Sequence, residues 1–525
     1  MALEPISLSE ARAAIIPAKR MMTPTNNPTL LTGYGSYGGF AAAPIGRTNQ
    51  EWIAFSRTAD QNLVVDLRRL RNRARERAIN SPIAAKFLSI IRTQVVGAHG
   101  IRVEYKVPKL RAREDGELLD DVINGKLLTA WEQWCHRGVC TVDGKRALRD
   151  VLLLAMDCLG RDGECFIRRR YVAKSASNPF GFALQMIDAD QVDESYNTAP
   201  GINGVQVRLG VEVDSDMRPI AYHVFSGFPS ETGGQKRRVR IPAEEIYHLY
   251  SPRFVSQTRG YPLMAPALYD MHQLDDYFKA ELTAARWGAK MIGAIESTGD
   301  VQYMGDTGKP PGGASPVQVG DATLFNMPIN TKLNNVTPEH PTAAFSSFTE
   351  RSLRFIASAL NVPYHELGND YASVNFSSGR LSVNESRDFY TELQAMLIDT
   401  LVQPIHDDWI KAALLNNAID LPFDPGRYTN SSAREFIPRA WHGIQPFEEA
   451  KTAILEMQNG LTTKAEVMHG KGKDWRKTLK QLAVESEYEE SLGLKLGTDV
   501  SGKSTTEVDN EEPPPESGGA GAPPK

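Results

Sequence analysis

The sequence predicts an α+β fold, in which helical segments come first, strands follow and helices return afterwards. Residues 61–160 carry apolar side chains at helical spacing, whereas residues 163–250 contain short runs with the alternation of strands. Helical spacing returns after residue 265. The chain has 525 residues, of which 41% are hydrophobic and 23% are charged, so it holds enough apolar material for a large core.

The sequence of the amino-terminal part predicts an extended arm followed by a helix with a break in it. Residues 1–60 are rich in glycine, proline, threonine and asparagine, and we expect an extended arm there. Leucine and alanine then recur at helical spacing over residues 61–92. Pro82 should break this helix, and its second part should end at Gly97.

One side of the first helix carries a run of arginine. The run comprises Arg68, Arg69, Arg71, Arg73, Arg75 and Arg77. Clustered guanidinium groups bind phosphates, which would suit a contact with nucleic acid. However, no aromatic side chains that stack on bases lie between these arginines. The favoured interpretation is therefore a solvated helix face or an arginine-lined contact between subunits.

The segment 163–250 is predicted to be mostly β-strand. Its clearest signal is the strict alternation of apolar residues from Val205 to Val213, which predicts a strand there. Two amphipathic helices, around 127–134 and 148–159, should precede the strands. Further short strands are expected at 165–171, 182–187, 220–225 and 239–246.

Two separated helices, 265–290 and 345–360, are the main prediction for the middle of the chain. The second should stop before Pro363, because the residue before proline disfavours helix. The residues between them, 293–342, are rich in proline and glycine. That composition predicts a compact module of loops and strands.

The last part of the chain should be mainly helical. A polar insert over 365–380 precedes a longer helix that Pro404 should kink. Residues 446–489 again show helical spacing. The final 17 residues, from Asp509, contain no large apolar side chain and are expected to be disordered.

Motifs that suggest chemistry have simpler explanations here. The Gly-x-Gly-x-x-Gly match at Gly33–Gly38 lacks the flanking strand and helix of a dinucleotide site. The acidic cluster formed by Asp188, Asp190, Asp193 and Glu194 lacks the glycine and terminal glutamate of a calcium loop, which favours an acidic turn. His248 is interpreted as a structural histidine. No motif for nucleophilic or zinc-dependent hydrolysis occurs, so we predict no enzyme activity, cofactor or metal.

Charge and cysteine content narrow the class of protein further. Lysine and arginine number 59 against 64 acidic residues, a net charge of −5, which argues against affinity for DNA based on phosphate neutralisation. The four cysteines, at 135, 140, 158 and 165, are interpreted as small buried thiols in a reducing compartment. No apolar run approaches the roughly 20 residues that span a bilayer, and no secretory signal is expected.

A set of segments between about residue 34 and about residue 490 closely resembles the lambda-type family of tailed-bacteriophage portal proteins. The first group of matching residues is Arg253, Gln257, Arg259, Gly260 and Pro262. The second group is Pro363, Tyr364 and Asp370, followed by Asn375, Phe376, Ser377, Ser378 and Arg380. Upstream, Gly97 and the pair Gly163-Glu164 also match. Phe376 departs from the tyrosine that the family more often has, which removes a hydroxyl.

The resemblance implies a ring of about 12 subunits at one capsid vertex, through which double-stranded DNA is packaged and ejected. It implies a portal fold with a mixed α/β wing, a two-helix stem, a clip, a tunnel loop and a helical crown. The implied divisions are the arm 1–60, wing 61–264, stem helices 265–292 and 343–362 around the clip 293–342, tunnel loop 363–380, wing helix 381–422, crown 423–498 and disordered tail 499–525. The implied partners are the large terminase subunit, major capsid and scaffolding proteins, and head-completion or tail-connector proteins. Assembly would occur in the host cytoplasm and the protein would end in the virion, with no membrane contact.

The resemblance also suggests which residues face DNA. The candidates are Asn369, Asn375, Phe376, Ser377, Ser378 and Arg380, most of which are polar enough to contact phosphates weakly. Arg380 either serves as a tunnel-loop cation or starts a helix and pairs with Glu385 or Asp388. The alternatives for the whole chain are another virion head-assembly protein, or an enzyme that uses Cys165 or the acidic cluster.

Overall fold

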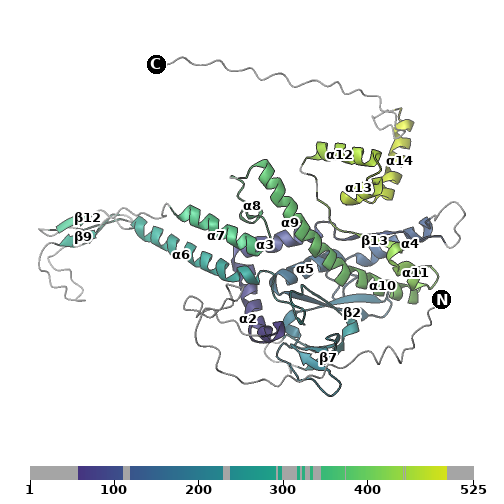
Figure 1. The fold of residues 1–525 in the computed structure, drawn as a ribbon, viewed down its shortest axis with the longest axis horizontal. Coiled ribbons are helices and arrows are strands. Elements are labelled where there is room, and N and C mark those ends of the chain that lie inside the picture. Colours follow the sequence, from purple (N-terminus) through teal and green to yellow (C-terminus); the bar gives the residue numbers. More distant parts are fainter. Residues whose placement is uncertain are drawn as a thin grey trace, which may run out of the picture. The chain divides into compact units, whose positions relative to one another are not determined.

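The architecture is that of a computed structural model, drawn in Figure 1. The structure describes residues 57–109, 119–228, 237–290, 294–297, 316–319, 322–325, 331–334, 344–372, 374–441, 443 and 445–493. The arm predicted over 1–60 lies almost entirely outside the described residues, and so does the tail predicted over 499–525. None of the described helices is long and apolar enough to cross a bilayer.

The first helices begin and end at local signals. They are α2 (Ala59–Asn80), α3 (Pro82–Ile91), a π-helical turn (Arg92–Val96), α4 (Asp121–Cys135) and α5 (Leu148–Arg161). Thr58 caps α2 through a reciprocal pair of hydrogen bonds with Gln61. Pro82 opens α3, which confirms the predicted break. Gly97 ends the π-helical turn with a φ of 67°, a conformation that glycine adopts without strain.

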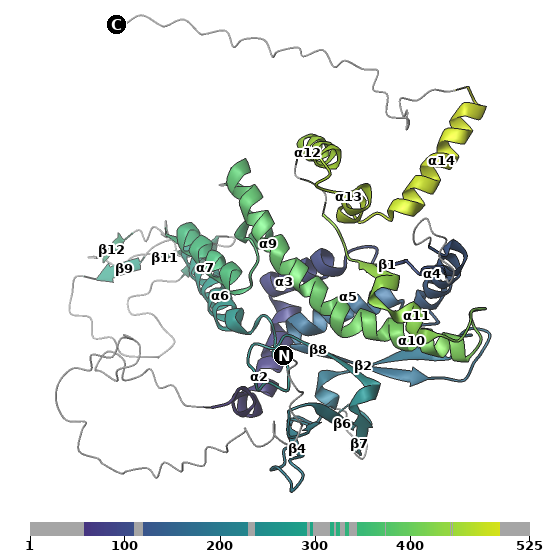
Figure 2. The ribbon, with the colours of Figure 1, turned by 45° about the vertical axis from the view of Figure 1, so that its right-hand side comes forward.

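Two antiparallel sheets follow these helices (Figure 2). The first has the order β3-β2-β8 and consists of β2 (Glu164–Tyr171), β3 (Phe182–Ile187) and β8 (Ile246–Tyr250). The second has the order β4-β5-β6-β7 and consists of β4 (Gln206–Arg208), β5 (Val211–Val213), β6 (Pro219–Phe225) and β7 (Arg238–Pro242). The single strand predicted over 239–246 is wrong, because a 3₁₀ turn at Ala243–Glu245 divides it between the two sheets.

The single strand predicted from Val205 to Val213 is also wrong, because this segment forms a tight hairpin. Leu209 and Gly210 form the turn with φ values of 49° and 81°, the positive pair of a two-residue turn. Leu209 is nevertheless buried, and it packs against Leu63 and Leu67 of α2. The alternation of apolar residues therefore continues through the turn. For this reason the alternation alone does not reveal where the turn lies.

The two separated helices predicted in the middle of the chain are confirmed and lie side by side in both views (Figures 1 and 2). They are α6 (Leu268–Lys290) and α7 (Phe345–Ala359). The rings of Tyr277 and Phe348 meet with centroids 4.8 Å apart. Between the helices lie β9 (Ala294–Ser297), β10 (Pro316–Val319), β11 (Ala322–Phe325) and β12 (Thr331–Asn334). The pairs β9–β12 and β10–β11 are antiparallel and nested along the chain, as expected for a module of loops and strands.

The longer helix predicted after residue 380 begins earlier and carries its irregularity just before Pro404. Its parts are α9 (Phe376–Leu397), a π-helical turn (Ile398–Val402) and α10 (Gln403–Leu415). The extra residue of a π turn is a known response to an interrupted hydrogen-bond ladder. In α10, Trp409 packs edge-on against Trp131 of α4, with centroids 4.9 Å apart. This contact joins α10 to the main core.

The resemblance implies a crown from residue 423, and the first elements of this segment pack on the preceding fold. Helix α11 (Pro425–Thr429) buries Tyr428 in the main core, and β13 (Arg434–Ile437) pairs with β1 (Arg102–Tyr105). These residues therefore belong with the preceding fold. The remaining helices are α12 (Pro446–Gln458), α13 (Lys464–Gly470) and α14 (Trp475–Ser491), and none of them contains a fully buried residue.

Candidate functional site

The residues predicted to face DNA surround the junction between helices α8 (Tyr364–Gly368) and α9. Asn369 ends α8 in the left-handed conformation, with a φ of 51°, which asparagine tolerates better than most residues. Asn375 precedes α9, and its side-chain oxygen accepts a hydrogen bond from Ser378 N at 2.8 Å. The resemblance implies a tunnel loop over 363–380, and in the structure α8 lies near the start of this segment while α9 begins at Phe376. Phe376, Ser377, Ser378 and Arg380 form the first turns of α9.

The signal for this helix start is the N-cap residue Asn375, which apolar spacing alone does not reveal. Asparagine is among the best N-cap residues, and removing such a cap costs about 1 kcal/mol. We therefore expect Asn375→Ala to lower the free energy of unfolding by about 1 kcal/mol, whereas Asn375→Asp should change it little. Urea unfolding followed by circular dichroism measures the difference. Equal loss in both variants would show that the cap does not hold the helix start.

A tyrosine–carboxylate pair braces the junction from the α8 side. The Tyr364 hydroxyl donates to Asp370 Oδ2 at 2.7 Å, and the Arg354 guanidinium lies 5.2 Å from the Tyr364 ring centroid. Burial and the Asp370 carboxylate raise the pKa of Tyr364 to about 12. The same hydrogen bond lowers the pKa of Asp370. The pair therefore stays in the hydrogen-bonded form at neutral pH, with the proton on the tyrosine.

Contacts from α3 and the π-helical turn after it hold α8 in place. Lys86 Nζ donates to Asn369 Oδ1 at 3.0 Å, and Gln94 donates to Glu366 at 2.9 Å. Tyr390 of α9 donates to the other oxygen of Glu366 at 3.3 Å. The junction is thus tied to two elements that are remote from it in sequence.

Arg380 pairs with neither of its predicted carboxylate partners in any hydrogen bond or ion pair described for it. Its Nη1 donates to Gln445 Oε1 at 3.1 Å, and Gln445 is the N-cap residue of α12. Arg380 is exposed and lines a cavity of about 260 Å³ together with Asn375, His365 and Tyr371. It therefore keeps a positive charge at the surface beside the polar candidates.

The first group of matching residues builds a buried ion network around Glu164. Arg259 is fully buried, and its Nη2 and Nε donate to the two Glu164 oxygens at 2.6 and 2.8 Å. Arg71 of α2 donates to Glu164 at 2.9 Å, and Gly260 N donates to it at 3.1 Å. Gln257 supports this arrangement by donating to the Arg259 carbonyl at 2.8 Å.

Two further residues of this group serve the backbone around Arg259. Arg253 N donates to Gln257 Oε1 at 2.9 Å, which closes the turn. Pro262 lies against Gly163, because a Cβ at Gly163 would come within 2.5 Å of the proline nitrogen. His248 also fits its structural interpretation: its Nε2 faces Glu164 at 3.2 Å.

The network predicts a specific dependence on pH. Burial alone would raise the pKa of Glu164, but Arg259, His248 and Arg71 together hold it well below its usual range. The folded pKa thus lies below the unfolded value of about 4.3, so the stabilisation is present at neutral pH and is lost as the pH falls towards the folded pKa. We expect the stability difference between wild type and Glu164→Gln to be largest at pH 7 and to shrink below about pH 4. Urea unfolding at several pH values measures it; a constant difference would contradict the network.

The arginine run and the acidic cluster, which lie more than 100 positions apart in the sequence, bind each other. Arg71 contacts Asp190 at 2.7 Å and Glu194 at 3.2 Å, and Arg75 contacts Asp188 and Asp190 at 2.9 and 2.6 Å. The acidic turn is thus neutralised by α2. Arg68, Arg69 and Arg73 are exposed, as expected for a solvated helix face. That expectation is wrong for Arg71, which is fully buried.

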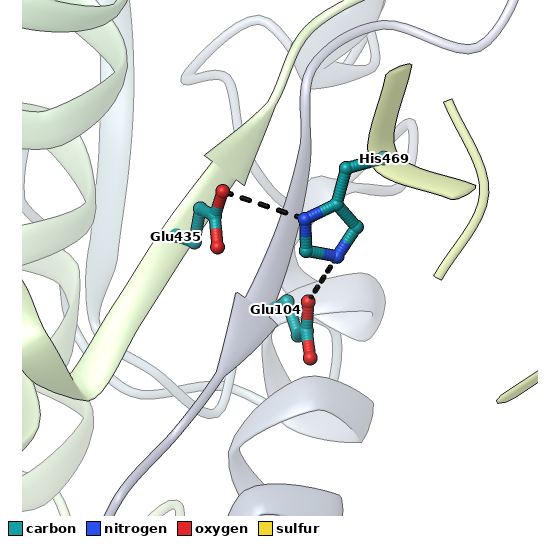
Figure 3. Close-up of side chains that lie close together, drawn as sticks. All are labelled: Glu104, Glu435 and His469. Carbon is teal, nitrogen blue, oxygen red and sulfur yellow. Dashed lines mark ion pairs between the residues drawn. The ribbon is translucent and has the colours of Figure 1, made fainter. Parts of the chain in front are cut away.

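A third polar cluster joins residues more than 300 positions apart, and no sequence pattern indicated it. His469 of α13 lies between Glu104 of β1 and Glu435 of β13 (Figure 3). Its Nε2 is 2.7 Å from Glu104, and its Nδ1 is 3.5 Å from Glu435. Because each nitrogen faces a different carboxylate, the arrangement is an ion-pair clasp between α13 and the β1–β13 sheet. Lys106 also pairs with Glu435, which further neutralises the cluster.

Cys165, the thiol considered as a candidate nucleophile, is buried. All four cysteines are unpaired, and Cys140 and Cys165 are buried. A hydrogen bond with Cys158, together with burial, raises the pKa of the Cys165 thiol well above its usual value. Because the thiolate is the reactive form, Cys165 is poorly suited to nucleophilic catalysis.

Comparisons with known proteins place the chain among phage proteins. Residues 45–394 match the family described as phage portal protein, lambda family. A probable portal protein of Halomonas phage phiHAP-1 is 30% identical over 484 residues, which cover 89% of this chain and 90% of that protein. Portal protein B of Escherichia phage lambda is 24% identical over 90% of this chain and 95% of its own length. Among solved structures, the neck of an empty GTA particle is 14% identical with a TM-score of 0.39, covering 82% of this chain and 99% of that one.

Proposed function

Because this chain belongs to the lambda family of phage portal proteins, we propose that it forms a closed ring of about 12 subunits at one vertex of the capsid. Double-stranded DNA would enter and leave the capsid through the ring. The large terminase subunit would dock on the segment between α6 and α7 during packaging, and head-completion or tail-connector proteins would replace it afterwards. Capsid and scaffolding proteins would surround the ring during assembly.

The observation that carries this proposal is the uncovered apolar surface of the α6–α7 pair. The exposed large side chains are Tyr269, Phe278, Leu282, Phe348 and Phe355. The Phe355 side chain, for example, is 66% exposed. It lies on α7, a helix whose apolar residues gather on one face. Exposed apolar surface of this kind marks a contact with another protein chain. Two different faces that meet head to tail, and whose rotation closes, generate a ring.

The charge and polarity of the chain suit a passage for DNA. A net charge of −5 per chain gives about −60 for twelve chains, which discourages tight retention of DNA. The α8–α9 junction offers mainly polar contacts from Asn369, Asn375, Ser377 and Ser378, with Arg380 as the nearby cation. Side chains of this kind touch phosphates weakly, as a sliding contact requires.

The ring is tested by placing a charge on the uncovered apolar face. We expect Phe355→Glu to convert rings to monomers, because the carboxylate would be desolvated at the subunit contact. Mass photometry of purified protein measures the subunit number, and capsids assembled with the variant should lack packaged DNA. Phe355→Leu should keep the ring, and a chain truncated after Gly497 should also keep it. Wild-type monomers with no ring would instead favour another role in head assembly.

A further inference from the structure

A cavity of about 840 Å³ lies between the β1–β13 sheet and the turn from α13 to α14. Its apolar lining includes Val96, Ile101, Val103, Trp131 and Ile437. Its cations are Arg102, Arg439, Lys471, Lys473 and Lys477, against the acidic side chains Glu132 and Asp474. The cavity therefore combines an apolar part of its lining with an excess of positive charge.

Most of these cations have no acidic partner. Within the described part of the chain, Arg102, Lys471, Lys473 and Lys477 form no ion pair, whereas neighbouring Arg476 lies 3.8 Å from Glu104. Asp474 is already used as the N-cap of α14, where it accepts hydrogen bonds from two backbone N–H groups. Four unpaired like charges around one cavity indicate an anionic partner.

The ion-pair clasp holds these lysines at the cavity. His469 fixes the end of α13 against Glu104 and Glu435 (Figure 3), and Lys471 and Lys473 lie two and four positions after it in the sequence. Gly472 permits the close approach there, since a Cβ at this position would lie 3.3 Å from Arg102 Nη2. The cationic side of the cavity is thus set by the docking of α13.

We propose that this cavity binds the acidic segment 507–516 of the chain itself. The segment contains Glu507, Asp509, Glu511, Glu512 and Glu516, with no basic residue, and it also carries Val508 and three consecutive prolines. Its carboxylates match the unpaired cations, and its apolar residues match the apolar part of the cavity lining. A DNA duplex would meet the cations through its phosphates, but its charged backbone offers little apolar surface to match the apolar lining.

The chain is long enough for this contact. Lys477 lines the cavity near the start of α14, and 14 further residues at 1.5 Å each place Ser491 roughly 21 Å away. Residues 492–506, fifteen in all, then separate Ser491 from Glu507, and they span up to roughly 50 Å when extended. The proposal does not depend on ring formation or on DNA passage.

The test uses the full-length chain and a fluorescein-labelled peptide of residues 505–518. In one variant of the full-length chain, the five acidic residues of the segment are replaced by their amides. The segment of this variant then no longer competes with the labelled peptide for the cavity. We expect this variant to bind the peptide at least about tenfold more tightly than wild type, by fluorescence anisotropy at low salt. Adding Lys471→Glu and Lys473→Glu should reduce binding at least about tenfold, whereas Lys464→Glu, on α13 but away from the cavity, should not.

Two results would overturn the proposal. Peptide binding that survives Lys471→Glu and Lys473→Glu would place the contact elsewhere. Failure of the amide variant to bind the peptide would also overturn the proposal, and binding of a short DNA duplex that requires the same lysines would then assign the cavity to nucleic acid. Circular dichroism of each variant confirms that the fold is retained.

Discussion

Glu164→Gln should lower the free energy of unfolding by about 3–5 kcal/mol, because it leaves two buried guanidinium groups without their shared carboxylate. Arg71 and Arg259 are both fully buried and both contact Glu164. The amide retains the volume of the side chain, so the loss reports charge rather than packing. Urea unfolding at pH 7, followed by circular dichroism, measures this change.

An exposed ion pair supplies the control for Glu164. Asp420 is fully exposed and lies 3.0 Å from Lys126. Exposed pairs are screened by solvent and contribute little to stability, so Asp420→Asn should leave the free energy of unfolding almost unchanged. A similar small effect from Glu164→Gln would mean that Arg71 and Arg259 find other partners, and that the network does not organise this part of the fold.

Gly260→Ala should cost about 3 kcal/mol, because the new methyl group would meet the backbone rather than a movable side chain. A Cβ at Gly260 would lie 2.1 Å from the Gly163 carbonyl oxygen. The shift needed to relieve this clash would also pull Gly260 N away from Glu164, which it contacts at 3.1 Å. Thermal and urea unfolding both report the loss.

A second glycine serves as the matched control. Gly125 lies inside α4, and a Cβ there would meet no atom within 4 Å. Gly125→Ala should therefore stabilise the protein by up to about 1 kcal/mol, since alanine favours helix. Destabilisation by both substitutions would contradict the claim that close backbone approach is the reason for glycine at position 260.

Local patterns predicted most of the helices and fewer of the strands. The helix over 61–92 broke at Pro82, and the paired helices around 265–290 and 345–360 formed because each has its own apolar spacing. The strand pattern failed from Val205 to Val213, where the turn residue Leu209 is itself buried. A turn is usually indicated by polar residues. Here the turn residue Leu209 is apolar, because it packs against α2.

The candidate site was predicted as a set of residues but not as a geometry. The resemblance identified Asn375 and Arg380 as candidates. It did not show that they lie at a helix start, which the hydrogen bond from Ser378 N to Asn375 Oδ1 reveals. Similarly, Glu164 and Arg259 both stand in matching segments, yet their spacing of 95 positions gives no sign that they touch. Family patterns record which residues recur, and they do not record which pairs meet.

The sequence by itself determined the order of helices and strands, the breaks at proline and glycine, and the family. These features depend on neighbouring residues, whose spacing and backbone preferences are visible in the chain. Only the tertiary structure decided that Arg71 is buried against Glu164 and Asp190, and that His469 docks α13 on β1 and β13. Such pairings join charges far apart in sequence, and their partners are selected by the path of the folded backbone and by the cost of burying a charge alone.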